Sequence, residues 1–148
     1  MEISSKSLED TKKFAKDFVE KISTLEKTRG GATVVGLYGN LGSGKTTFVQ
    51  CVAEILGVKE HLTSPTFVIL KSYKLTAESF KLLHHIDAYR LKDGRDLLKL
   101  RFDELLADPK NLILIEWADL VADILPNDVI KLQFEFVDEK TRKIESGI

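Results

Sequence analysis

The stretch Gly39–Thr46, which reads GNLGSGKT, constrains the fold more than any other part of the sequence. It matches the pattern G-x-x-x-x-G-K-[ST], in which glycines let the backbone wrap around a phosphate with its N–H groups pointing inward. The apolar run ATVVGLY (32–38) precedes it, and a helical pattern (45–56) follows and stops before Gly57. Strand, glycine loop and helix are the context that the motif requires, so the sequence predicts a phosphate-binding loop.

The remaining chain predicts an α/β domain. Apolar residues at helical spacing indicate a helix from Ser7 to Thr28, with Ser7 and Asp10 as a capping pair; it covers the sheet or, less favoured, serves as a docking face. Pro65 places TSPTF (63–67) in a loop. The later pattern predicts two strands (67–73 and 80–89), a helix (93–106), a buried strand (111–118), a short helix (119–125) and an alternating strand (128–138). This order predicts one domain (1–148) with a three-layer, P-loop NTPase-like α/β fold, whose largely parallel central sheet carries an antiparallel hairpin.

Composition narrows the class of protein. A length of 148 residues suits one domain, and 22 basic against 23 acidic residues give no global positive field for nucleic acid or an anionic membrane. The one cysteine, Cys51, cannot form an internal disulfide. Neither a signal peptide nor an apolar run long enough to cross a bilayer is visible. We therefore expect a cytoplasmic protein without a membrane partner.

The loop motif assigns chemistry to particular side chains. Lys45 can reach the β- and γ-phosphates of a nucleotide, and the Thr46 hydroxyl can complete the ligand shell of Mg²⁺. The residues expected to contact the nucleotide in this segment are Gly39, Asn40, Leu41, Gly42, Ser43, Gly44, Lys45, Thr46 and Thr47. A glycine-rich turn before an ordinary helix is the alternative, which the strand–loop–helix context disfavours.

Hydrolysis needs further groups at the ends of neighbouring strands. Glu116 follows the apolar run LILI and Asp87 ends LLHHID, so both carboxylates are expected at the carboxyl edge of the sheet, unless they are simply solvated acids. His84 and His85 are adjacent and must point to opposite faces of a strand, so at most one faces the nucleotide. Trp117, taken alone, is better explained as a core residue.

Four ordered segments resemble the bacterial TsaE (YjeE) family, the ATPase component of tRNA threonylcarbamoyladenosine biosynthesis. They are GNLGSGKTT (39–47), TSPTF (63–67), HIDAYRL (85–91) and IEW (115–117), and the resemblance spans about residues 7–142. It implies ATP and Mg²⁺ as cofactors, with Lys45 on the phosphates and Thr46 and Glu116 as metal ligands. It also implies Asp87 as the acid needed for hydrolysis, Thr66 in a switch-like loop near the nucleotide, and Trp117 beside the nucleotide rather than in the core.

The same resemblance implies partners. TsaE proteins dock on TsaD and TsaB, which transfer a threonylcarbamoyl group to tRNA, so tRNA contact is expected only through that complex. Two departures from the family pattern occur, Asn40 in the loop and Ala118-Asp119 after IEW, and neither removes a side chain with a chemical role. The roles of Tyr89 and Arg90 stay open, as does the choice between general base and outer metal partner for Asp87.

Other functions remain open from the residues. The loop also serves small-molecule and nucleoside kinases, although the chain is short and lacks an Arg-rich lid segment. A nucleotide-gated binding module that hydrolyses nothing would share the fold and leave Asp87 idle. A GTPase is disfavoured because no N-K-x-D segment occurs, and direct recognition of tRNA is the least favoured hypothesis because the net charge is -1.

Overall fold

The strand ahead of the glycine loop, β2 (Thr33–Tyr38), lies at the centre of a seven-stranded sheet. The computed structural model describes residues 1–25, 30–40, 42–60 and 69–148. Across the sheet the strand order is β1-β7-β6-β2-β5-β4-β3. The other elements are β1 (Glu2–Ser5), α1 (Leu8–Thr24), α2 (Lys45–Ile55), β3 (Leu70–Lys74), β4 (Leu82–Asp87), α3 (Gly94–Leu98), α4 (Phe102–Ala107), β5 (Asn111–Glu116), the 3₁₀ helix η1 (Ala118–Ile124), β6 (Ile130–Asp138) and β7 (Thr141–Ser146).

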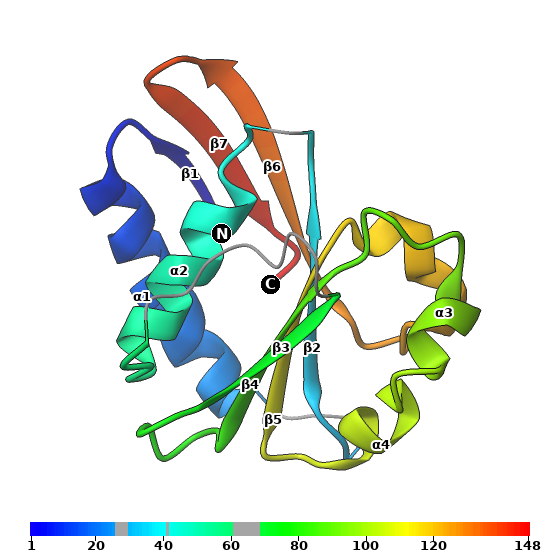
Figure 1. Ribbon diagram of the computed structural model, residues 1–148. Coiled ribbons are helices and arrows are strands. Elements are labelled where there is room, and N and C mark those ends of the chain that lie inside the picture. Colours follow the sequence, from blue (N-terminus) through cyan, green and yellow to red (C-terminus); the bar gives the residue numbers. More distant parts are fainter. Residues whose placement is uncertain (26–29, 41, 61–68) are drawn as a thin grey trace.

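Helices cover both faces of the sheet, which confirms the predicted α/β class and its three layers. Figure 1 shows α1 and α2 on one side of the sheet and α3 and α4 on the other. Because successive residues of a strand point to opposite faces, β2, which is buried up to Leu37, and the fully buried β5 supply both cores. The core under α1 and α2 contains Val35, Leu37, Leu112 and Leu114, and the opposite core contains Val34, Ile113 and Ile115.

The sheet is mixed rather than largely parallel. The central pairings β4–β5, β5–β2 and β2–β6 are parallel, whereas β3–β4, β6–β7 and β7–β1 are antiparallel. The predicted hairpin is confirmed as β3 and β4, in which Ser72 pairs with His84. Since the parallel strands all end at one edge, the ends of β2, β4 and β5 lie together there.

Local sequence explains where α1 begins and where α2 ends. Ser7 caps α1, because its side-chain oxygen accepts a hydrogen bond from the Asp10 amide at 3.2 Å, and Asp10 accepts one from the Lys6 amide at 3.0 Å. Helix α1 ends at Thr24, and the end predicted at Thr28 lies outside the described residues. Gly57 has a left-handed φ of +85° just after α2, as a residue that ends a helix should. Within the described ranges, no helix has the length and apolar character needed to cross a membrane.

Two parts of the predicted order are wrong. The helix predicted over residues 93–106 is two short helices, α3 and α4, because Arg101 adopts a left-handed φ of +61° between them. Strands β1 and β7 were not predicted, since each is an edge-region strand with one apolar residue, Ile3 or Ile144. These two isoleucines pair directly across β1 and β7, and Ile144 is buried. TSPTF lies outside the described residues.

Candidate functional site

The glycine loop leaves β2 and enters the first turn of α2. Gly39, Gly42 and Gly44 have φ values of +142°, +77° and +100°. A side chain at Gly39 would collide with the carbonyl oxygen of Phe134 on β6, and Gly44 is the left-handed residue at the N-cap of α2. The loop thus turns over the N-terminus of α2, where free N–H groups and the helix dipole favour an anion.

The Lys45 side chain lies against this loop and is only 5% exposed. Its ammonium group donates a hydrogen bond to the Gly39 carbonyl oxygen and lies 3.9 Å from the centre of the Trp117 ring. Burial lowers the pKa of Lys45 below its usual value, while the carboxylates of Glu116, Asp87 and Asp119 oppose that fall. A cation is therefore held between the glycine loop and a group of acids.

Glu116 connects the first turn of α2 to two strands. The Thr46 hydroxyl donates a hydrogen bond of 3.1 Å to Glu116 Oε1, and His85 Nε2 lies 2.6 Å from Glu116 Oε2. Glu116 is 4% exposed and His85 is fully buried. Both carboxylate oxygens thus have partners, one on α2 and one on β4, as buried polar atoms require.

Asp87 lies beside Glu116 at the same edge of the sheet, because the two residues are paired in the β4–β5 register. Burial is the largest cause that raises the pKa of Asp87, and the Glu116 carboxylate raises it further. The Tyr89 amide acts the other way by donating a 3.1 Å hydrogen bond to Asp87 Oδ1. Asp87 is therefore a carboxyl group with increased proton affinity next to a second acid.

Trp117 turns the chain sharply at the end of β5. Its φ of +59° is left-handed, which is a strained conformation for a bulky residue, and η1 begins at the next residue. One contact is with Lys45, and the Tyr89 ring lies 5.2 Å away, centre to centre. Trp117 is half-buried and packs against the core that contains Ile113 and Ile115, while its contact with Lys45 places it at the glycine loop.

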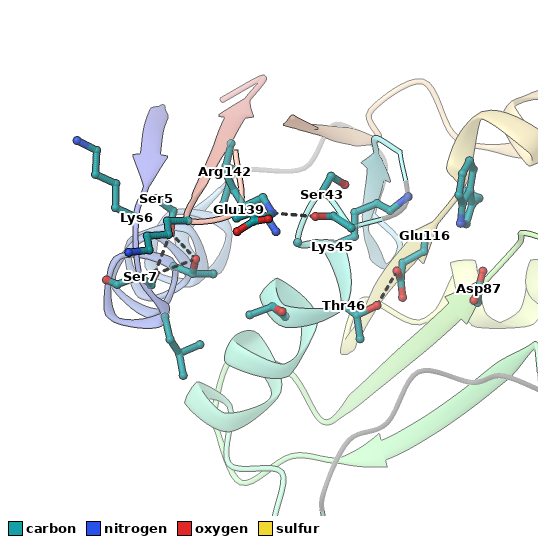
Figure 2. Close-up of a pocket in the computed structure, with 18 residues that line it drawn as sticks. Ser5, Lys6, Ser7, Ser43, Lys45, Thr46, Asp87, Glu116, Glu139 and Arg142 are labelled. Carbon is teal, nitrogen blue, oxygen red and sulfur yellow. Dashed lines mark hydrogen bonds between the residues drawn. The ribbon is translucent and has the colours of Figure 1, made fainter. Parts of the chain in front are cut away.

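An open cleft of about 620 Å³ lies over the loop and brings most of the predicted residues together. Figure 2 shows Glu116 and Asp87 at one end of the cleft, and Ser5, Lys6, Ser7 and Arg142 at the other. The predicted residues that line it are Gly42, Ser43, Gly44, Lys45, Thr46, Thr47, Asp87, Glu116 and Trp117. Gly39 and Asn40 instead line a separate hollow beside β6 and β7, while Leu41 and Thr66 lie outside the described residues.

Two residues of the site were not assigned a role from sequence. Arg142 Nε donates a 2.7 Å hydrogen bond to the carbonyl oxygen of Gly42, which is 100 positions earlier in the chain. Local sequence patterns do not predict a contact over such a separation. His85 contacts Glu116 directly, and its place two residues before Asp87 was the available clue. Alternation along a strand puts positions 85 and 87 on one side.

The chemistry of the donors suits a hard divalent cation. The Thr46 hydroxyl and the Glu116 carboxylate are oxygen ligands that already lie within hydrogen-bond distance of each other. Among the described residues, no set of three or more His, Cys, Asp or Glu side chains forms a metal cage. Mg²⁺ commonly takes one or two protein oxygens and completes its shell with phosphate oxygens and water, so the residues present fit that ion together with a nucleotide.

Comparisons with known proteins show which family the chain resembles. The sequence model of the family described as "Threonylcarbamoyl adenosine biosynthesis protein TsaE" matches residues 5–144. The tRNA threonylcarbamoyladenosine biosynthesis protein TsaE of Rickettsia felis is 34% identical over 135 residues, which cover 90% of this chain and 72% of the relative. The protein of the same name from Streptomyces coelicolor is 37% identical over 112 residues, covering 75% of this chain and 74% of the relative.

A solved structure extends the likeness to the fold. The crystal structure of YdiB from Bacillus subtilis is similar with a TM-score of 0.70 and 27% identity, over 99% of this chain and 83% of that protein. The family predicted from the four sequence segments is thus confirmed by comparisons that cover nearly the whole chain. The chain belongs to the TsaE family of threonylcarbamoyladenosine biosynthesis proteins.

Proposed function

We propose that this protein is a Mg²⁺-dependent ATPase subunit that acts with TsaD and TsaB in the threonylcarbamoyladenosine modification of tRNA. In this proposal residues 1–148 form one cytoplasmic domain of the P-loop NTPase type, which reaches tRNA only through the complex. The observation that carries it is the 3.1 Å contact between Thr46 and Glu116 beneath the glycine loop. It joins an anion-binding helix terminus to a metal-binding carboxylate, which is the combination that phosphoryl chemistry needs.

The loop and Lys45 would hold the phosphates. Backbone N–H groups at the start of α2 would offer the anion site, and a phosphate oxygen would replace the Gly39 carbonyl as the acceptor for Lys45. Thr46 and Glu116 would be the protein ligands of Mg²⁺. When bound, the metal ion would neutralise charge on the phosphates during hydrolysis.

Asp87 is proposed as the acid that hydrolysis requires. It lies next to Glu116 at the strand edge and lines the same cleft as Lys45 and Thr46. A carboxyl group whose pKa is raised by burial can accept a proton from water more readily than an ordinary aspartate. The alternative role, contact with metal-bound water, uses the same position and the same charge.

Three observations support a subunit that depends on partners. The relatives are named for the biosynthesis of a modified tRNA nucleoside, and the chain has a net charge of -1, which gives little basis for binding tRNA alone. Trp117 and Tyr89 form an aromatic pair at the mouth of the site, and Tyr89 is 56% exposed. That exposed ring is available to a partner protein.

The test is ATP hydrolysis by the purified chain with Mg²⁺, alone and with TsaD and TsaB. We expect slow release of phosphate alone, a higher rate with the partners, and loss of nucleotide binding in Lys45→Ala. Glu116→Ala should lose the dependence on Mg²⁺. Partners that neither bind nor alter the rate would refute the proposed role, and ADP formed only with a small-molecule acceptor would indicate a kinase instead.

A further inference from the structure

His85 belongs to the H-x-D segment, but the proposed chemistry uses only the aspartate. The imidazole of His85 is 0% exposed, and its Nε2 lies 2.6 Å from Glu116 Oε2. The neighbouring His84 points the other way, and its Nδ1 lies 2.7 Å from Ser72 Oγ on β3. Both histidines are therefore buried but have different partners, and His85 is the one that contacts the proposed metal ligand.

The hydrogen-bond pattern assigns the proton on the His85 ring. Nδ1 of His85 is buried and has no hydrogen-bond partner among the described residues. A carboxylate oxygen accepts hydrogen bonds, so the short contact places a proton on Nε2 of the ring. Nε2–H therefore donates to Glu116 Oε2.

This contact determines how Glu116 presents its other oxygen. A glutamate side chain has three rotatable bonds and loses rotamer freedom when a metal ion fixes it. Here Oε2 is held by a ring that is itself locked inside the sheet, and Oε1 lies 3.1 Å from the Thr46 hydroxyl. The carboxylate is thus oriented before any cation arrives, as partners behind metal ligands commonly achieve.

We propose that His85 is a positioning residue, which donates from Nε2 to Glu116 and keeps the opposite carboxylate oxygen directed at Thr46 for a divalent cation. The inference rests on the proposed function, because it concerns the same cation. It also explains the spacing of H-x-D: His85 and Asp87 lie two residues apart on β4, on one side of the strand, and both flank the end of β5. One supports Glu116 from within the sheet and the other lies beside it in the cleft.

The experiment titrates MgCl₂ at a fixed concentration of ATP and follows the fluorescence of Trp117, the one tryptophan of the chain. In His85→Leu, the Mg²⁺ concentration at half effect should rise about 10–100-fold. Affinity for ATP in excess EDTA should stay within about 2-fold of wild type, because His85 touches the carboxylate and not the loop. His84→Leu is the matched control, since it removes an equally buried imidazole that faces Ser72, and it should leave the Mg²⁺ dependence unchanged.

Two amide variants separate the hydrogen bond from packing. His85→Gln places an N–H near the position of Nε2 and should recover most of the Mg²⁺ response, whereas His85→Asn places it near Nδ1 and should not. Both remain informative if the leucine variant folds poorly, as judged by circular dichroism. In a Glu116→Ala background, His85→Leu should have no further effect on Mg²⁺, because the group that it positions is gone.

Several results would overturn the inference. An unchanged Mg²⁺ response in His85→Leu would do so, as would an equal loss of ATP affinity with and without Mg²⁺, or the same shift in His84→Leu. A wild-type protein that binds ATP without any influence of Mg²⁺ would instead refute the metal-dependent function on which the inference rests. The wild-type titration therefore distinguishes the two failures.

Discussion

Replacing Phe48 by alanine tests how strongly the packing beneath α2 supports the glycine loop. Phe48 is fully buried, and its ring centre lies 6.0 Å from that of Phe14, 5.7 Å from Phe18 and 5.5 Å from Phe134. Phe14 and Phe18 belong to α1, and Phe134 belongs to β6. This one ring therefore joins both helices of the first layer to the sheet, three residues after Lys45.

The size of the effect follows from these contacts. Truncating a buried phenylalanine to alanine costs about 3–5 kcal/mol, and three aromatic neighbours, each worth roughly 0.5–1.5 kcal/mol, place Phe48→Ala toward the upper end. Domains unfold with a free energy of about 5–15 kcal/mol, so this variant would lose a third or more of its stability. For a chain near 150 residues, the midpoint of thermal unfolding should fall by roughly 10–15 °C.

Urea unfolding followed by circular dichroism and by Trp117 fluorescence measures this loss. Ile55→Ala is the control, because Ile55 lies at the end of the same helix and is 38% exposed, and it should cost about 1 kcal/mol or less. Phe48→Leu should fall between the two, since it keeps most of the volume and loses the ring contacts. If Phe48→Ala were no more destabilising than Ile55→Ala, the aromatic cluster would not connect the layers and the reasoning would be refuted.

Three further predictions concern the site. Asp87→Asn should lower the turnover of ATP by about 100-fold or more while ATP affinity in a fluorescence titration stays within about 3-fold; equal losses in both would contradict its role in hydrolysis. Burial raises the pKa of Asp87, so the folded state holds that proton more tightly than the unfolded state. Wild type should therefore lose stability relative to Asp87→Asn as pH rises from about 4 through the raised pKa. Urea midpoints of the two proteins that change in parallel across pH 4 to 7 would exclude this. Arg142→Ala should weaken ATP binding about 3–10-fold by removing the hydrogen bond to Gly42, and Lys140→Ala, which lines the cleft without a contact to that carbonyl, should have a smaller effect.

Local patterns were enough to predict the part of the site that one continuous segment builds. Strand β2, the loop and α2 lie together in sequence, and Lys45 and Thr46 follow from the motif because the helix starts there. Glu116 was also predictable, since a run of apolar residues that ends in an acid implies a buried strand with a carboxylate at its edge. In both cases, the information lies within one continuous segment of the chain.

Contacts between distant segments were not predictable in this way. His85 was limited by strand alternation to one of two faces, and only the β4–β5 register shows that its face is the one that holds Glu116. The break at Arg101 likewise depends on a single backbone conformation that arginine rarely adopts, so the helical pattern continued through it. Where a side chain's partner comes from another element, periodicity supplies the direction but not the partner.

The wall of the cleft opposite the acids is the part of the site that local sequence patterns predict least, because segments from both ends of the chain form it. Ser5 is the last residue of β1, Lys6 and Ser7 follow it, and Arg142 lies on β7, which pairs with every residue of β1. Closing this pair joins segments more than 130 residues apart, whereas the strand–loop–helix unit forms from neighbours in sequence. Arg142 lies on β7, so its contact with the loop requires that strand to be in place. The cleft therefore forms only when the sheet is complete.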